Sequence, residues 1–275
     1  MSPLTPLKHV LPEEIKTLYW NNGYSSRLIA SFYSVSHRGV LKYMKKHDIP
    51  RRPPGGILQN TKYPFSNDRL EKAYLLGLRA TDLYVTRHWK QVQVSLTGLG
   101  GTLDAFRQAF DKYSPVKVWG DNKYPEGTSR YIYTYLDRSF QFLINKPQTV
   151  PKWTGEDDEF YAFFSGCIDG DGTVKADPRF RAYYVGVCNS KINFLRSLER
   201  WLRKLGYHPG LFYKKQTTKR MLIYRYDDLR LLIPHLLRYM KHTERIKKIR
   251  TIQAILASKF KGADRTVFSE RAREL

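Results

Sequence analysis

The sequence predicts an α+β protein in which one unit is repeated, preceded by a small all-α domain. Three observations support this prediction: an apolar run that ends in alternating carboxylates and glycines, a degraded copy of that run upstream, and similar strand and helix patterns after each copy. Two diverged copies of a helix–hairpin–helix–hairpin–helix unit indicate an internal pseudo-twofold axis. We therefore expect two four-stranded antiparallel sheets within one chain, and a monomer.

The central run spans residues 160–174. Its apolar part, residues 160–168, follows a cluster of acids and predicts a buried helix with a capped N-terminus. Gly170 or Gly172 should end this helix, because a residue without a Cβ can leave the helical conformation in a sharp turn. Asp171 is then held at the bottom of a helix, beside a turn.

The sequence Asp-Gly-Asp-Gly also occurs in ordinary turns and opens the calcium loop of EF-hands. An EF-hand requires a bidentate Glu at its twelfth position, where this chain has Phe180. We therefore reject the calcium loop. The upstream copy distinguishes the motif from an ordinary turn.

That copy spans residues 73–85. Aligning Gly77 with Gly166 places Asp82 against Asp171. The pseudo-twofold axis should bring the two motif helices together through their small residues, which are Gly77, Ala80, Gly166 and Gly170. Asp82 and Asp171 would then lie side by side, and paired carboxylates on a strongly basic protein indicate a metal site that faces phosphates.

These residues carry a resemblance to a known family. Residues 164–172 resemble the LAGLIDADG motif of homing endonucleases, and residues 75–83 resemble a worn first copy. Residues 140–147 and 150–153 are similar to the joint between repeats in single-chain members. The resemblance covers residues 68–260, and the first motif departs from the pattern at Arg79, Ala80 and Leu83.

The resemblance implies a duplicated αββαββα core whose two four-stranded sheets form saddles on DNA. It also implies metal-dependent cleavage of both DNA strands, with Mg²⁺ or another divalent cation held by Asp82 and Asp171. Since the two copies differ, the target should be long and asymmetric. Family members keep a basic residue beside the active site, and the matching positions are Lys146 and Lys241.

Composition limits the other classes of function. The chain has 275 residues and a formal net charge of +23, which favours a polyanionic partner such as double-stranded DNA. No stretch is apolar enough to span a membrane and residues 1–10 do not resemble a signal peptide, so we expect a cytoplasmic or organellar protein that is not secreted. Cys167 and Cys188 are expected to be buried thiols rather than a disulfide.

Residues 1–53 form the first predicted domain. Helices are expected at 12–21, 25–33 and 37–47, with Ser36 capping the third. This pattern resembles a helix-turn-helix domain, whose recognition helix would present basic side chains to a major groove: His37, Arg38, Lys42 and Lys45. A three-helix module that contacts only protein is the alternative.

The remaining domain boundaries follow from composition. Residues 54–67, rich in Pro and Gly, form a linker, followed by repeat 1 at 68–150 and by repeat 2 with a helical tail at 151–275. Outward-facing amides and cations on the strands suit base edges and phosphates. The candidate DNA-binding residues on the two repeats are Gln91, Gln93, Lys117, Lys214, Lys215, Gln216 and Arg225.

Two other functions remain open at this stage. A maturase would use the same saddle to bind intron RNA and would not need Asp82 or Asp171. A DNA-binding regulator would keep both domains without cleavage, which the altered first motif favours. The presence of both terminal acids argues against the regulator.

Overall fold

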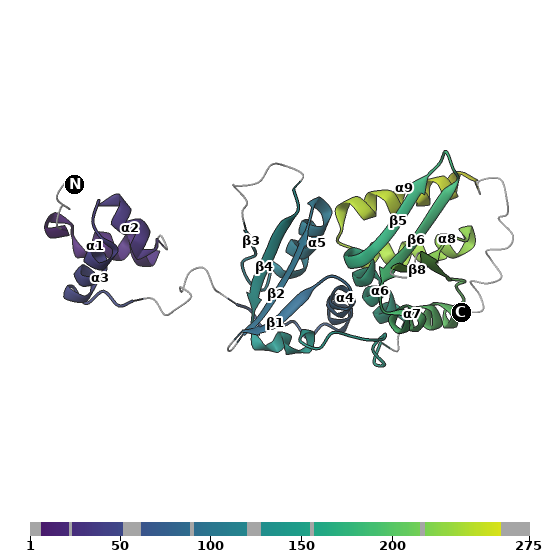
Figure 1. Cartoon of the computed structure of the whole chain (residues 1–275), viewed down its shortest axis with the longest axis horizontal. Coiled ribbons are helices and arrows are strands. Elements are labelled where there is room, and N and C mark those ends of the chain that lie inside the picture. Colours follow the sequence, from purple (N-terminus) through teal and green to yellow (C-terminus); the bar gives the residue numbers. More distant parts are fainter. Residues whose placement is uncertain are drawn as a thin grey trace. The chain divides into compact units, whose positions relative to one another are not determined.

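A computed structural model describes residues 7–21, 24–51, 62–88, 91–119, 128–154, 157–214 and 218–259. The chain divides into two compact units, residues 1–62 and residues 63–275 (Figure 1). Each unit has a hydrophobic core of its own. None of the helices in the described ranges is long and apolar enough to cross a membrane.

The first unit is helical. Its helices are a 3-10 turn (Leu7–His9), α1 (Pro12–Lys16) continued by a π-helical turn (Thr17–Asn21), α2 (Ser26–Phe32) and α3 (His37–Lys46). The predicted cap of α3 is confirmed, because the Gly39 amide donates to Ser36 Oγ at 3.0 Å. Ser25 caps α2 in the same way, accepting from the Leu28 amide at 3.1 Å. Such caps satisfy helix amides that otherwise have no partner.

The core of the first unit is small. Ile15, Val40 and Met44 are fully buried. On α2, however, only Ile29 and Ala30 point inward, and the apolar side chains of Leu28 and Phe32 are exposed to 41% and 55%. Helical spacing alone predicts a common apolar face for Leu28, Ile29 and Phe32, but this is not the face that α2 buries.

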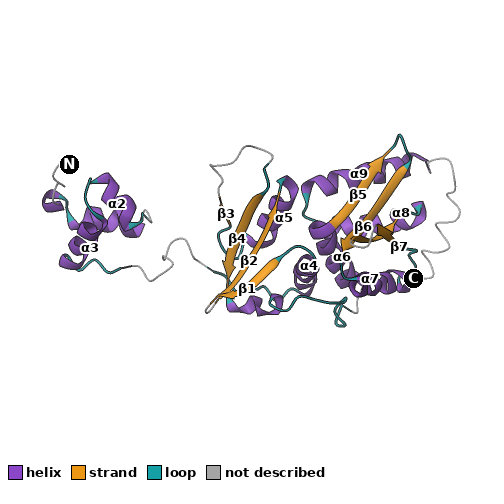
Figure 2. Ribbon diagram, viewed as in Figure 1, coloured by secondary structure: helices purple, strands orange, loops and turns teal. Residues whose placement is uncertain are grey.

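The second unit has the predicted α+β architecture, in which each repeat supplies one sheet (Figure 2). Repeat 1 contains α4 (Arg69–Ala80), β1 (Tyr84–His88), β2 (Gln91–Gly98), α5 (Gly100–Phe110), β3 (Lys117–Trp119), β4 (Arg130–Leu136) and a 3-10 helix (Arg138–Leu143). Repeat 2 contains α6 (Asp157–Asp171), β5 (Gly172–Asp177), β6 (Ala182–Asn189), α7 (Ile192–Lys204), β7 (Gly210–Lys214), β8 (Thr218–Ile223), α8 (Tyr226–Tyr239) and α9 (Thr243–Lys259).

Both sheets are antiparallel and have equivalent strand orders, β1-β2-β4-β3 and β5-β6-β8-β7. Buried and more exposed residues alternate along much of β2, β4 and β6, as expected for a sheet with one face on the core. Val92 and Val94 face inward as predicted, and Val185 and Val187 do the same in the second sheet.

The strand registers correct the predicted correspondence between the repeats. Thr86 pairs with Gln93, and Lys175 pairs with Tyr184. Thr86 and Lys175 follow their motif acids at the same distance, so Gln93 corresponds to Tyr184. Matching the similar runs Val92-Gln-Val94 and Val185-Gly-Val187 by sequence alone would pair Gln93 with Gly186 instead. The shift arises because the β5–β6 connection, residues 178–181, is longer than the β1–β2 connection. A shift of two residues keeps every side chain on its predicted face.

Helices α4 and α6 cross in close contact at their glycines. A Cβ on Gly77 would overlap the carbonyl oxygen of Phe163, and a Cβ on Gly166 would overlap that of Tyr74. Gly170 faces the other helix end, where a Cβ would meet the Thr81 side chain. The predicted packing of the motif helices through small residues is confirmed.

The start of α4 differs from the prediction. Asp68 caps this helix, with its Oδ1 accepting from the amides of Leu70 at 2.8 Å and Glu71 at 3.3 Å. The sequence alone would also allow Ser66 or Asn67 as the cap, but Asn67 has a positive φ of 62° and therefore makes the turn that precedes the cap.

The described end of the predicted linker packs on the second unit. Phe65 is buried in its core, and the Phe65 amide donates to Ser139 Oγ at 2.7 Å. The Tyr63 amide donates to the carbonyl of Tyr113 at 2.9 Å. Residues 52–61, which carry most of the predicted linker, lie outside the described residues.

The C-terminal helices cover the second repeat. A proline inside a helix is expected to interrupt or bend it, but α8 is continuous from Tyr226 to Tyr239 across Pro234. Helix α9 packs back on the domain, with Ile249 and Ile252 fully buried.

Candidate active site

The two motif acids follow the helix crossing directly. Helix α4 ends at Ala80, with Thr81 as its C-cap, so Asp82 is the second residue after the helix. Asp171 is the last residue of α6. A Cβ on Gly170 would lie 3.3 Å from the Cβ of Asp82, so the two helix ends are in contact. The structure thus places Asp82 and Asp171 next to each other, as the sequence predicted.

The carboxylates of these two residues influence each other. Partial burial raises the pKa of Asp82 above its ordinary value, although the charges of Arg245 and Lys146 oppose the rise. Burial also raises the pKa of Asp171, and the negative charge of Asp82 raises it further. The two acids therefore form a partly desolvated pair of like charges, an environment common at functional sites.

One cation from each repeat contacts the carbonyl that directly precedes an acid. Lys146 Nζ donates to the Thr81 carbonyl oxygen at 2.6 Å. Arg245 Nη1 donates to the Gly170 carbonyl oxygen at 2.8 Å, and also to the carbonyl oxygens of Ile168 and Asp169. Both cations lower the pKa of both acids. Lys146 and Arg245 thus occupy pseudo-equivalent positions beside the carboxylate pair.

Arg245 was not predicted from the sequence, which indicated Lys241 for this position. The Lys241 ammonium lies 4.9 Å from the centroid of the Tyr74 ring. Burial lowers its pKa, and the charges that act on it come from Glu71, Asp169 and Lys112. Lys241 therefore belongs to a different cluster of charges from Lys146. The feature of the sequence that could have indicated Arg245 is its position as a cation in the first turn of α9.

Among the described residues, Arg79, an unusual residue for the motif helix, hydrogen-bonds only to backbone oxygens. Its guanidinium donates to the carbonyls of Leu143 at 2.8 Å, Leu83 at 2.8 Å and Ile144 at 3.1 Å. Leu83 follows Asp82, and Ile144 precedes Lys146 by two residues. Arg79 therefore fixes the chain on both sides of the first-repeat half of the site.

Asp169, the other acid of the second motif, is fully buried and structural. Its Oδ2 accepts from Tyr74 Oη at 2.8 Å and from the amides of Lys241 at 2.6 Å and His242 at 3.3 Å. Burial raises its pKa to about 6. These bonds tie α6 to the segment that leads into α9, and so they help to position Arg245.

His242 connects the two repeats at the start of α9. Its side chain is buried, with Nε2 3.3 Å from Thr102 Oγ1 and Nδ1 accepting from the Arg245 amide at 3.4 Å. This arrangement needs a neutral ring, because a proton on Nδ1 would face an N–H donor. Burial and the charge of Arg245 lower the pKa of His242 from 6.5 to about 4, although Glu244 and Asp104 act in the opposite direction.

We therefore expect His242 to make stability fall in acid. A histidine with a lowered folded-state pKa contributes stability above its unfolded-state pKa, and this is lost as the pH falls from 6.5 toward 4. The loss should reach about 3 kcal/mol in the free energy of unfolding. Urea unfolding at pH 7 and pH 4 measures it in the wild type and in His242→Asn, since asparagine can cap α9 but does not titrate. An equal loss of stability in both proteins would contradict this prediction.

The carboxylate pair suits a divalent cation that is shared with a substrate. Within the described ranges, no group of three or more His, Cys, Asp or Glu side chains could hold a metal ion. Mg²⁺ is commonly held by only one or two carboxylates, together with water and substrate phosphate oxygens. A cation between Asp82 and Asp171 would also relieve the repulsion that raises the pKa of Asp171. This donor set fits Mg²⁺ bound together with a phosphodiester.

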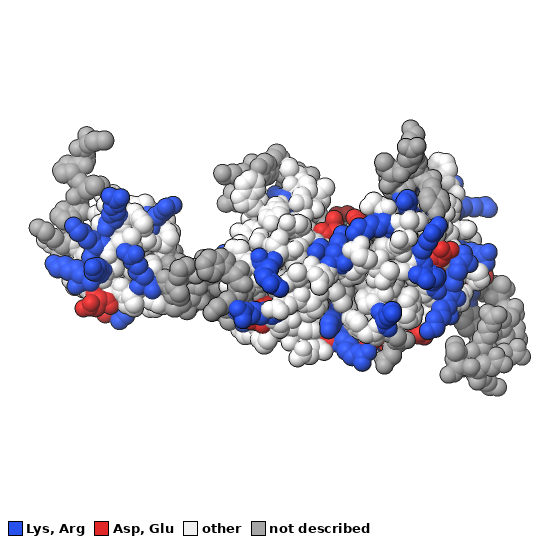
Figure 3. Space-filling view, turned by 60° about the horizontal axis from the view of Figure 1, so that its bottom comes forward, with Lys and Arg blue, Asp and Glu red and all other residues white. Residues whose placement is uncertain are grey.

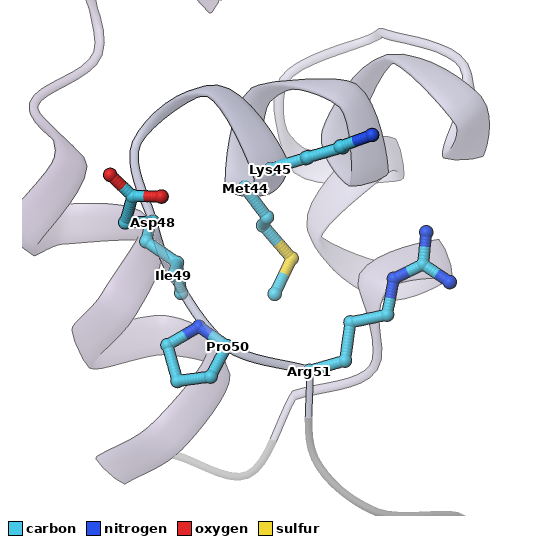
Figure 4. Close-up of a pocket in the computed structure, with 6 residues that line it drawn as sticks. All are labelled: Met44, Lys45, Asp48, Ile49, Pro50 and Arg51. Atoms are coloured by element: carbon cyan, nitrogen blue, oxygen red, sulfur yellow. The ribbon is translucent and has the colours of Figure 1, made fainter.

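The basic residues predicted on α3 are at the surface of the first unit. Arg38, Lys42 and Lys45 are exposed, whereas His37 is half-buried with Nε2 3.0 Å from Ser26 Oγ. Lys and Arg side chains gather on the face of this unit that Figure 3 shows. A hollow of about 340 Å³ lies at the C-terminal end of α3, with Lys45 and Arg51 on one side of it and Met44 pointing into it (Figure 4).

Some of the candidate DNA-binding residues lie on the sheets as predicted, and others do not. Gln91, Gln93 and Lys117 lie on the outward side of the first sheet, half-buried. Arg225 was expected on a strand, but β8 ends at Ile223 and Arg225 is the exposed N-cap residue of α8. Lys214 ends β7, while Lys215 and Gln216 lie outside the described residues.

Comparison with known proteins agrees with this geometry. Residues 159–239, which span α6, the second sheet and α8, match the family model of the LAGLIDADG-like domain. The second unit has the α+β fold of LAGLIDADG homing endonucleases, with two four-stranded antiparallel sheets and paired motif helices.

Three solved structures are similar in fold. Full-length DUF199/WhiA from Thermatoga maritima is 16% identical, with 77% of this chain and 68% of that chain covered and a TM-score of 0.48. The homing endonuclease I-WcaI bound to its DNA recognition sequence is 14% identical, with 76% and 92% covered and a TM-score of 0.46. I-DmoI in complex with DNA and Ca is 17% identical, with 62% and 90% covered and a TM-score of 0.43. None of the curated proteins compared with the sequence matches it.

Proposed function

We propose that this chain is a metal-dependent DNA endonuclease that cleaves both strands of a long, asymmetric site. The observation that carries the proposal is the pair of motif acids at touching helix ends, each with a cation on the carbonyl directly before it. The formal charge of +23 supplies the attraction for a polyanion, and the match to the LAGLIDADG-like domain covers the second half of the site.

The reaction is hydrolysis of a phosphodiester: water adds to phosphorus, the bond from phosphorus to the 3′ oxygen breaks, and that oxygen takes up a proton. Mg²⁺ held by Asp82 and Asp171, when bound, supplies an activated water and offsets negative charge on the phosphate. Lys146 donates one N–H to the Thr81 carbonyl oxygen, which leaves two N–H donors for phosphate oxygens. Arg245 keeps the end of α6 rigid and adds a second positive charge beside the acids.

The pseudo-twofold arrangement accounts for cleavage of both strands. A DNA duplex has a local twofold axis of its own, so a two-fold protein site can present equivalent groups to its two strands. Asp82 with Lys146 belongs to repeat 1, and Asp171 with Arg245 belongs to repeat 2. Each pair serves one strand, while the sheets bind the flanking grooves and α3 of the first unit extends the contact.

Selection from a plasmid library with randomised inserts tests the proposal. In the presence of Mg²⁺ we expect a small set of sequences to be linearised, and no linear product with EDTA or with the double variant Asp82→Asn/Asp171→Asn. Affinity for the selected site should fall steeply with salt, with a slope of about −0.9 for each phosphate neutralised.

The same experiment separates the other two functions. Specific duplex binding without cleavage by the wild type in Mg²⁺ would identify a regulator on this fold. Competition of the selected DNA against folded intron RNA at two salt concentrations addresses the maturase, because a maturase should prefer the RNA at both.

A further inference from the structure

The outward faces of the two sheets carry different chemistry at equivalent positions. The registers align them row by row: Thr86, Gln93 and Tyr135 form one row of the first sheet, and Lys175 and Tyr184 form the equivalent row of the second. Lys175 thus replaces Thr86, and Tyr184 replaces Gln93. One row further out Ala182, which pairs with Asp177, replaces Gln91, which pairs with His88.

The outward rows level with the motif acids also show a neutral residue on the first sheet and a cation on the second. On the first sheet this row contains Thr97 paired with Tyr131, and on the second it contains Cys188 paired with Arg220. Arg220 therefore replaces Tyr131. In both changes a neutral hydroxyl residue of the first sheet becomes a cation on the second, and both side-chain amides of the first sheet are lost.

In the major groove, side-chain amides and cations bond to the edges of different bases. An amide such as Gln pairs with the N6 and N7 atoms of adenine, and Thr methyl groups and aromatic rings contact the methyl group of thymine. Arg and Lys donate to the O6 and N7 atoms of guanine. Lys117, the cation on edge strand β3 of the first sheet, is placed to contact a phosphate.

The cations of the second face have hydrogen-bonding capacity to spare. The Nε atom of Arg220 is buried with no hydrogen-bond partner among the described residues. The ion pair of Lys175 is loose, with Nζ 3.9 Å from Asp177 Oδ2. Gln93 donates to Tyr131 Oη only at 3.5 Å, near the limit of a hydrogen bond. The Lys175 ammonium and the Gln93 amide can therefore bond to a base edge, and the protein does not satisfy all the donors of the Arg220 guanidinium.

We propose that the first sheet reads a half-site rich in A·T pairs through Gln91 and Gln93, and that the second sheet reads guanine through Lys175 and Arg220. The guanine read by Arg220 lies near the centre of the target, because Arg220 is level with the end of α6. The guanine read by Lys175 lies further out. This inference rests on the proposed function, and it specifies the class of DNA that the enzyme recognises.

The test is a binding-site selection from random duplex DNA with Asp82→Asn/Asp171→Asn, so that the result does not depend on cleavage. One half of the selected site should be enriched in A·T pairs, and the other should contain two preferred guanines. Arg220→Tyr and Lys175→Thr place the first-sheet residue in the second sheet. Each should reduce the preference for one guanine about tenfold or more and leave the other half unchanged.

Gln93→Ala is the complementary variant and should relax one A·T preference in the opposite half. Circular dichroism of each variant checks that it is folded. Two halves of the same composition, no sequence preference at all, or a change in the same half from Gln93→Ala and Arg220→Tyr would each overturn the inference. If one of these results is found but the wild type cleaves DNA, the inference fails and the proposed function stands. If the two halves differ as expected but the wild type does not cleave, the inference stands and the proposed function fails.

Discussion

Asp171→Asn is expected to abolish double-strand cleavage while changing the affinity for the target duplex only a few-fold. The substitution removes a negative charge that we propose holds the cation, but it leaves the helix crossing and both sheets unchanged. Loss of one metal-binding carboxylate should reduce the cleavage rate about a thousandfold or more. Linearisation of a plasmid carrying the selected site measures the rate, and an electrophoretic mobility shift measures binding.

Two variants control for the loss of charge. Asp82→Asn should have the same effect on at least one strand, which appears as nicked circular plasmid. Asp111→Asn makes the same chemical change at an exposed C-cap position of α5 and should cleave like the wild type. Double-strand cleavage by Asp171→Asn at the wild-type rate would place the active site elsewhere.

The parts of the site that were predicted from sequence depend on local patterns. The apolar run before Asp171 predicts a buried helix, and Gly166 predicts a close approach because any other residue would hold a neighbour at a distance. The weaker copy around Gly77 then gives the second helix. The adjacent positions of Asp82 and Asp171 follow from these two helices alone, because each acid lies at a helix end.

The parts that were missed depend on contacts between distant segments. Arg245 reaches the Gly170 carbonyl from the start of α9, where Asp169 binds the amides of Lys241 and His242 and so helps to set the direction of the helix. Nothing in the sequence near Arg245 encodes that contact. The loop that shifted the strand alignment was missed for a related reason, since a register slip of two residues preserves the alternation of apolar and polar side chains.

Gly166→Ala is expected to destabilise the second unit by about 3 kcal/mol or more in the free energy of unfolding. Alanine in place of glycine favours a helix by up to about 1 kcal/mol, so the local effect alone would stabilise α6. Here the new Cβ would overlap the Tyr74 carbonyl oxygen. A backbone atom cannot move away by changing rotamer, so α4 and α6 must separate and lose packing along their length. Denaturant unfolding of the wild type and variant measures the difference.

Ser165→Ala is the matched control, because it places alanine one residue earlier in the same buried helix and adds no atom. Within the described part of the chain the Ser165 hydroxyl makes one long hydrogen bond, 3.4 Å to the Leu236 carbonyl, so its loss should cost about 1 kcal/mol or less. Gly77→Ala should resemble Gly166→Ala, since its Cβ would overlap the Phe163 carbonyl. Both glycine variants should also cleave more slowly than their remaining folded fraction predicts, because separating the helices moves Asp82 away from Asp171. Stability within about 1 kcal/mol of the wild type in both glycine variants would show that the helix contact does not set the distance between the acids.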